Sequence, residues 1–184
     1  MEMPKDLTEV TLRRKDVYDG KILKVHVDDV RLPNGREAVR EVVDHVDGAA
    51  VLAMDEENRV LVVRQYRYVF GKVLAELPAG KLDPGETPEE CGRRELLEEV
   101  GAVAGTMTDL GALFPTPAYV DEVIHMYLAE HLTYTHQKLD EGEFLEAEAV
   151  PLSRLVEEIL AGTIRDAKTQ AAILKTALLL ERRK

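Results

Sequence analysis

The chain is poor in cysteine and in long apolar runs. Its single cysteine, Cys91, excludes an internal disulfide bond and is typical of a protein kept in a reducing cytosol. No apolar run approaches the roughly 18 residues of a membrane-spanning helix, and residues 1–10, MEMPKDLTEV, lack the apolar region of a signal peptide. We therefore expect a soluble, cytoplasmic protein that does not act at a membrane.

Positive charge is also scarce, with 24 Lys and Arg against 35 Asp and Glu and a formal net charge of −11. This balance argues against nucleic acid as the main partner. A polyanionic small molecule would also be repelled, so a site for one requires divalent metal ions and locally placed arginines. The five histidines show no zinc spacing. With 184 residues, 45% of them hydrophobic, the chain fits one domain with at most a small appendage.

Residues 80–102, GKLDPGETPEECGRRELLEEVGA, combine a turn, a helix start and a group of carboxylates. Thr87 is expected to cap the helix, with Pro88 at its first position and Glu90 completing a capping box. Gly101 is expected to end the helix after about three and a half turns. The stretch therefore predicts a loop followed by one well-defined helix.

The side chains of this helix divide into two groups at about 100° per residue. Three carboxylates share one side: Glu95, Glu98 and Glu99. Three aliphatic residues take the other side, where we expect a core: Leu96, Leu97 and Val100. An acidic face is most often simply solvated, but Cys91 and Gly92 lie one turn earlier on the carboxylate side and let a ligand or loop approach. Because clustered carboxylates suit Mg²⁺ or Mn²⁺, the pattern predicts a metal site.

The same stretch resembles the Nudix box, G-x5-E-x7-R-E-U-x-E-E-x-G-U, the signature of hydrolases that act on a nucleoside diphosphate linked to another moiety. The match begins at Gly80, continues through Glu86 and ends with the run 94–102; Ala102 stands where a bulky aliphatic residue is usual. The resemblance implies an α/β Nudix fold, a mixed β-sheet sandwiched between helices. It also implies that Arg94 pairs with Glu86 and fixes the loop on the helix.

The resemblance further implies a set of metal ligands for Mg²⁺, with Mn²⁺ as a possible substitute. Glu95 and Glu99 would be the main ligands, Glu98 would assist, and the carbonyl of Ala79 would complete the set. The substrate would be a nucleoside diphosphate sugar.

Residues 7–46 predict three antiparallel strands, with Asn34-Gly35 as a hairpin turn between two of them. Three strands with one apolar face are barely stable alone. We therefore divide the chain into an N-terminal β domain, residues 1–46, and a Nudix domain, residues 47–184. In ADP-ribose-hydrolysing members of the family a similar sheet builds a homodimer and contributes to the substrate pocket, and the resemblance implies the same here.

Substrate-binding residues are implied in both domains. Residues 48–67 predict two buried strands joined by the turn 55–58, and the second strand ends in the polar sequence Gln65-Tyr66-Arg67. In the ADP-ribose hydrolases a Q-x-R at this place directs its arginine to the diphosphate, which implies that role for Arg67. Arg40-Glu41 resembles an R-E pair at the mouth of the adenosine pocket, and Tyr18 is expected to join it.

An acidic loop, residues 139–143, precedes an alternating strand. A solvated turn is the usual interpretation of such a loop, but attack of water on phosphorus benefits from a carboxylate that orients or deprotonates the water. Relatives carry E-x-E here, which Glu141 and Glu143 match. We take Glu141 as the base and Glu143 as metal-linked, with the reverse assignment left open.

Two further segments bear on the fold and on specificity. Residues 152–160 carry an apolar stripe expected to lie in the core, and Asp166 is expected to cap a last helix through Leu180. The sequence RDAKTQAA resembles the D-A-K-T of bacterial ADP-ribose hydrolases. In the linker PTPAYVDE, Ala118 replaces the glycine of the usual S-P-G, which bears on substrate choice.

These observations together predict Mg²⁺-dependent hydrolysis of ADP-ribose to AMP and ribose 5-phosphate. Two enzymatic alternatives are hydrolysis of another nucleoside diphosphate sugar and hydrolysis of a dinucleoside polyphosphate. A Nudix-like binding or regulatory module without turnover is the alternative of a different class. The complete carboxylate set favours an enzyme over such a module.

Overall fold

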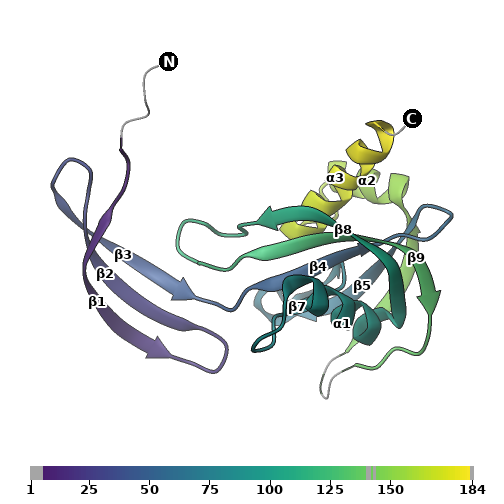
Figure 1. The fold of residues 1–184 in the computed structure, drawn as a ribbon, viewed down its shortest axis with the longest axis horizontal. Coiled ribbons are helices and arrows are strands. Elements are labelled where there is room, and N and C mark those ends of the chain that lie inside the picture. Colours follow the sequence, from purple (N-terminus) through teal and green to yellow (C-terminus); the bar gives the residue numbers. More distant parts are fainter. Residues whose placement is uncertain (1–5, 140–141, 143, 183–184) are drawn as a thin grey trace. The chain divides into compact units, whose positions relative to one another are not determined.

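The computed structural model describes residues 6–139, 142 and 144–182 (Figure 1). Two compact units are present: one contains the residues up to 46 together with 114–122, and the other contains residues 47–113 and those from 123 onward. The sequence predicts a division after residue 46, and the structure adds the segment 114–122 to the N-terminal unit. Within the described part of the chain, no helix combines the length and apolar character needed to cross a lipid bilayer.

The N-terminal unit is the predicted antiparallel sheet. Its strands β1 (Val10–Asp19), β2 (Lys24–Arg31) and β3 (Glu37–Asp44) pair in the order β1-β2-β3. The Asn34-Gly35 turn is present, and Gly35 has a φ of +83°, which glycine adopts without strain. Residues 114–122 run beside β3, because the Val43 amide donates to the Tyr119 carbonyl at 2.7 Å.

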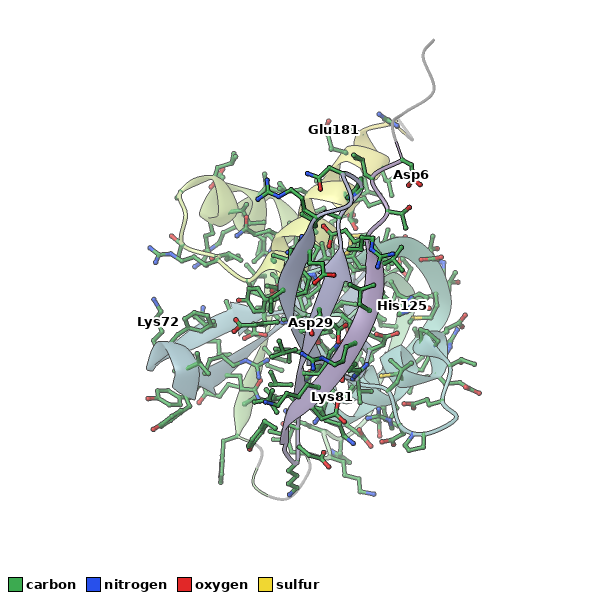
Figure 2. The ribbon with its side chains drawn as sticks, turned by 90° about the vertical axis from the view of Figure 1, so that its left-hand side faces the viewer. Asp6, Asp29, Lys72, Lys81, His125 and Glu181 are labelled. Atoms are coloured by element: carbon green, nitrogen blue, oxygen red, sulfur yellow. The ribbon has the colours of Figure 1, made fainter. Side chains whose placement is uncertain are left out.

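This small sheet leaves many apolar side chains exposed. Every residue of β1 is exposed. Arg13 on that strand donates to Asp29 of β2 at 2.8 Å, and Asp29 is labelled in Figure 2. Ten large apolar side chains among the described residues of the unit are at least 39% exposed: Leu7, Val10, Leu12, Val17, Tyr18, Ile22, Val39, Val46, Phe114 and Tyr119. The described chain therefore leaves this apolar surface uncovered.

The second unit contains two sheets. A four-stranded mixed sheet has the order β7 (Ala79–Lys81), β4 (Gly48–Ala53), β9 (Ile124–Tyr134), β8 (Ala102–Leu113), with β4 and β9 parallel. A three-stranded antiparallel sheet has the order β10 (Leu145–Pro151), β5 (Arg59–Arg67), β6 (Lys72–Glu76), and a short 3₁₀ helix, η1 (Tyr68–Phe70), connects β5 to β6. The predicted turn joins β4 to β5, but the two strands belong to different sheets and meet only at the Met54–Val60 bridge.

Helices cover both faces of the mixed sheet (Figure 1). Helix α1 (Pro88–Val100) packs on one face, where Leu96 lies in a buried cluster with Val51. Helices α2 (Leu152–Leu160) and α3 (Ala167–Arg182) pack on the other, where Ile173 lies in a cluster with Leu52. Since successive residues of β4 point to opposite faces, both clusters are built from one strand. The predicted Nudix α/β fold with a small N-terminal antiparallel sheet is confirmed.

Two predictions about which side chains are buried are wrong, those for Leu97 and Leu160. Leu97, predicted in the core, is 39% exposed, whereas Glu99, on the carboxylate side of the same helix, is 3% exposed. The reason is that α1 also faces β7, so the buried arc of the helix is displaced toward the carboxylates. Leu160, predicted in the core stripe of α2, is 78% exposed because it is the last residue of that helix.

Candidate active site

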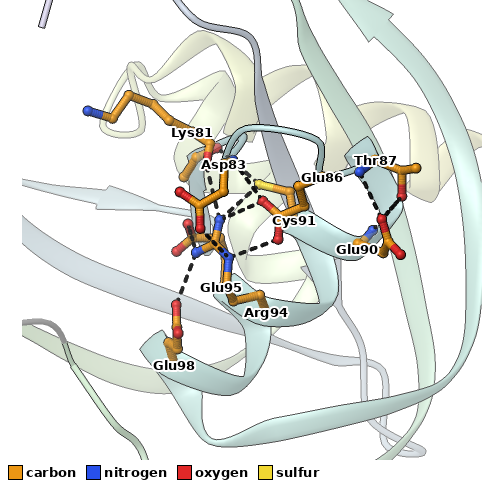
Figure 3. Close-up of polar contacts among 10 residues, drawn as sticks. Lys81, Asp83, Glu86, Thr87, Glu90, Cys91, Arg94, Glu95 and Glu98 are labelled. Atoms are coloured by element: carbon orange, nitrogen blue, oxygen red, sulfur yellow. Dashed lines mark hydrogen bonds and ion pairs between the residues drawn. The ribbon is translucent and has the colours of Figure 1, made fainter.

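The start of α1 has the predicted capping box (Figure 3). The Glu90 amide donates to Thr87 Oγ1 at 3.3 Å, and the Thr87 amide donates to Glu90 Oε2 at 2.9 Å. Pro88 occupies the first turn, and Gly101 ends the helix with a φ of +64°. These local interactions fix both ends of the helix that carries the carboxylates.

Arg94 connects the loop before α1 to two of the carboxylates (Figure 3). Its Nε and Nη2 donate to the two oxygens of Glu86 at 2.9 and 3.0 Å, which confirms the predicted pair. Its Nη1 donates to Glu95 at 2.6 Å and to Glu98 at 3.0 Å. The Glu86 hydrogen bond is the largest cause of the raised pKa of Arg94, and burial acts against it. The guanidinium of Arg94 therefore holds the carboxylates of Glu86, Glu95 and Glu98 around one positive charge.

Gly80 allows Glu95 to approach strand β7. A Cβ at position 80 would lie 1.8 Å from Glu95 Oε1, far inside van der Waals contact. The first glycine of the box is therefore needed because the carboxylate occupies the space of a side chain.

Glu99 is the most deeply buried carboxylate of the helix. Its Oε2 accepts a hydrogen bond from the Ala79 amide at 3.0 Å, so it is held at the start of β7. The backbone at the end of α1 is held as well, since the Lys138 amide donates to the Glu98 carbonyl at 2.9 Å and Gln137 Nε2 donates to the Glu99 carbonyl. Helix α1 thus contacts both β7 and the segment that enters the acidic loop.

Cys91 and Gly92 border other parts of the protein, so of the predicted ligand or loop it is the chain before α1 that approaches: the Cys91 thiol donates to the Gly80 carbonyl of β7 at 3.6 Å. Cys91 is fully buried, and a Cβ at Gly92 would lie 3.0 Å from Val51 Cγ2. These small residues allow α1 to pack closely on the mixed sheet. Burial raises the pKa of the Cys91 thiol to about 12, so it is protonated at neutral pH.

The donor atoms at this site suit a hard divalent cation, because Glu95, Glu98, Glu99 and the Ala79 main chain supply only oxygen ligands. In the described residues, no group of three or more His, Cys, Asp or Glu side chains is already arranged to hold a metal ion. Two of the carboxylates share the Arg94 guanidinium instead. The residue types fit the metal that the family uses, while the carboxylates are held by protein donors in this structure.

Arg67 lies at the end of β5 in an ionic network that the sequence did not indicate. Its Nε and Nη2 donate to the two oxygens of Glu76, on β6, at 2.7 and 2.8 Å. Lys168, at the start of α3, donates to Glu76 at 2.5 Å and to Asp166 at 3.0 Å. A single acidic residue in the apolar sequence VLAEL was the available signal for Glu76, and the D-A-K-T resemblance was the signal for Lys168.

Glu76 remains ionised despite being only 2% exposed. Burial alone would raise its pKa, but the hydrogen bond from Arg67 and the charge and hydrogen bond of Lys168 outweigh burial. The pKa of Glu76 therefore falls to about 2. A buried carboxylate with two cationic partners is the charge arrangement that stabilises the ionised form.

The other predicted residues lie in different places. Arg40, Glu41 and Tyr18 belong to the N-terminal unit, where Arg40 pairs with Glu9 at 2.9 Å and Tyr18 is 58% exposed. Glu141 and Glu143 lie outside the described residues. The structure thus brings together the box carboxylates, Ala79 and Arg94 within the second unit, which also contains the Arg67 network.

Comparison with known families agrees with this geometry. Residues 44–172 match the NUDIX domain, and residues 9–43 match the nucleoside diphosphate sugar hydrolase N-terminal domain. The chain belongs to the Nudix family and is a Nudix hydrolase.

Two relatives and one solved structure are similar to this chain over nearly its whole length. The chain is 39% identical over 180 residues to an ADP-ribose pyrophosphatase of Bacillus subtilis, covering 95% of this chain and 97% of the relative. It is 38% identical over 173 residues to a methanol dehydrogenase activator of Bacillus methanolicus, covering 93% and 94%. A crystal structure of an ADP compounds hydrolase superimposes with a TM-score of 0.85 at 24% identity over 98% of both chains, and this likeness supports the fold.

Proposed function

We propose that this Nudix hydrolase cleaves the diphosphate of ADP-ribose in the presence of Mg²⁺. Water adds to one phosphorus atom, the P–O bond to the bridging oxygen breaks, and AMP and ribose 5-phosphate leave. The observation that carries the proposal is the anchoring of Glu99 at Ala79 beside Glu95 and Glu98, which Arg94 holds. The likeness to an ADP-ribose pyrophosphatase over nearly the whole chain supports the choice of substrate.

We assign the metal to the oxygen ligands of the box: Glu95, Glu99 and the Ala79 carbonyl, with Glu98 assisting. A bound divalent ion would neutralise diphosphate charge and lower the pKa of a coordinated water. Arg94 remains bound to Glu86 throughout and keeps the loop and the helix in register. Mn²⁺, which accepts the same oxygen ligands, is the expected substitute.

The remaining substrate contacts fall to residues in both units. Arg67 would hold the diphosphate charge, because a guanidinium offers several donors to phosphate oxygens. Arg40, Glu41 and Tyr18 would contact the adenosine part. These four assignments rest on the family resemblance, and each can be tested by its KM effect.

The acidic loop would supply the carboxylate that activates the water. Glu141 is our candidate base and Glu143 our candidate metal-linked residue, and the two roles can be exchanged. Support comes from the anchoring of Gln137 and Lys138 to the last turn of α1, because this starts the loop beside the box carboxylates. A base must come within hydrogen-bond reach of the water it deprotonates.

We further propose that the enzyme is a cytoplasmic homodimer assembled through the N-terminal sheet. The exposed apolar side chains of that sheet provide a surface that a second copy would cover.

A substrate panel tests the proposed activity. Phosphatase-coupled phosphate release would be measured with Mg²⁺ for ADP-ribose, ADP-glucose, GDP-mannose and diadenosine polyphosphates, with chromatography of the products. ADP-ribose should give the highest kcat/KM and equal amounts of AMP and ribose 5-phosphate. Preference for another compound would replace the substrate, and absence of turnover on the whole panel would favour a binding or regulatory module.

A further inference from the structure

The network around Glu76 joins two strands of one sheet to the last helix. Glu76 carries one negative charge and is bonded to two cations, Arg67 and Lys168. The three side chains differ in exposure: 3% for Glu76, 11% for Lys168 and 41% for Arg67. Arg67 is therefore the group through which this network reaches solvent.

Lys168, the second cation, changes how strongly Arg67 attracts an anion. A bidentate arginine–carboxylate pair is neutral overall, and its attraction for a phosphate is weak. Lys168 brings a positive charge to the same carboxylate and so offsets part of the negative charge that Glu76 places beside Arg67. In the described part of the chain, Arg67 Nη1 has no hydrogen-bond partner, and this nitrogen is free to donate to an incoming oxygen.

Asp166 adds a second negative charge to the network, and this charge acts on both Lys168 and Arg67. Its Oδ2 accepts from the Thr169 amide at 2.9 Å and from Thr169 Oγ1 at 2.6 Å, at the start of α3. The positive end of the helix dipole compensates a carboxylate at this position in part. Asp166 therefore caps α3 and orients Lys168 toward Glu76.

The network is also linked to the box carboxylates. Thr169 Oγ1 accepts from the Leu77 amide at 2.9 Å, and two residues later the Ala79 amide donates to Glu99. The pKa of Arg67 is raised first by its hydrogen bond to Glu76, with burial opposing, and then by the charges of Glu76, Asp166 and Glu99. The backbone from Glu76 to Ala79 therefore joins the Arg67 network to the box carboxylate Glu99.

We propose that Lys168 is a positioning residue for the diphosphate: by sharing Glu76 with Arg67, it offsets the Glu76 charge and so strengthens the attraction of the Arg67 guanidinium for a substrate phosphate. This inference rests on the proposed function, since it requires a diphosphate substrate at Arg67. Lys168 acts through Arg67 and does not itself contact the substrate. The last helix of the chain thereby contributes to substrate affinity.

The test compares Lys168→Met with Lys175→Met in ADP-ribose hydrolysis. Lys175 is on the same helix and, among the residues that the structure describes, donates to the Leu110 carbonyl, so its variant removes an equal charge away from the network. Lys168→Met should raise KM about tenfold with kcat within about twofold, because the lost attraction acts equally on bound substrate and transition state. Lys175→Met should keep the wild-type KM, and Lys168→Arg should recover most of the lost affinity.

The double variant Glu76→Gln, Lys168→Met separates charge compensation from support of the fold. Removing Glu76 as well restores the net charge at Arg67, so KM should return to within about threefold of wild type. If Lys168 only supported the fold, the two substitutions would add, and the double variant would be worse than either single variant. Should Lys168→Met fail to fold, the KM of the double variant is compared with that of wild type. A KM raised by more than about threefold would overturn the inference.

The two possible failures are distinguishable. If the wild-type enzyme hydrolyses no nucleoside diphosphate sugar, the proposed function falls. If it hydrolyses one and Lys168→Met has the same KM as Lys175→Met, the inference alone is overturned.

Discussion

The buried Glu76 should make folding stability depend on pH in a defined acidic window. Its pKa is about 2 in the folded chain against an ordinary value of 4.5. Because the folded pKa is the lower one, folding favours the ionised form, and the stabilisation is present above about pH 4.5 and lost as pH falls through about 2. This difference between the folded and unfolded pKa contributes about 3 kcal/mol to the free energy of unfolding at neutral pH, of which about 2 kcal/mol should be lost by about pH 3.

The measurement is urea unfolding of wild type and Glu76→Gln at several pH values. Glutamine keeps the shape but cannot ionise, so the variant should be less stable by an amount that is constant above about pH 5. That difference should shrink as pH falls toward about 2. Glu146→Gln, an exposed carboxylate on β10, is the matched control. A wild-type minus Glu76→Gln difference that stays the same from pH 5 to pH 2.5 would refute the reasoning.

Three further predictions concern catalysis and assembly. Glu99→Gln should lower kcat at least about 100-fold, the order expected when a major charge contact is lost, and should melt within a few degrees of wild type. Glu89→Gln on the same helix is the control. Wild-type turnover by Glu99→Gln would show that the Glu99 carboxylate has a structural role only. Replacing Glu141 and Glu143 together by glutamine should abolish most turnover of ADP-ribose, measured by phosphate release, and undiminished hydrolysis would remove the loop from the mechanism. Sedimentation at micromolar concentration should give twice the chain mass of 20.6 kDa, and a monomer would contradict the proposed dimer.

Features set by neighbouring residues could be predicted from the sequence. The capping box of Thr87 and Glu90 and the turn at Gly35 depend on contacts within a few positions. The Arg94–Glu86 pair spans only eight residues and was implied by the spacing of the box. Local chemistry therefore predicted the start and end of α1 and much of the loop before it.

Features set by distant partners could not be predicted in this way. Helical periodicity predicts that the three carboxylates share one side of α1. It does not predict that Glu99 is buried and Leu97 exposed, because this depends on where β7 packs against the helix. Likewise, Glu76 and Lys168 are 92 positions apart, and no periodic pattern connects them. Only the packing of α3 beside β6 reveals that they share a charge network.

The hydrogen bond from the Leu77 amide to Thr169 Oγ1 has a consequence for synthesis of the protein. The ribosome makes the whole Nudix box long before residue 169, since the bond joins positions 92 apart. A nascent chain therefore carries every box carboxylate while Glu76 still lacks its lysine. Domains fold as units as synthesis proceeds from the N-terminus, so this network is completed only after α3 has been made. Substrate affinity that depends on Lys168 is acquired only once α3 has been synthesised, and a chain that stops before α3 would lack it.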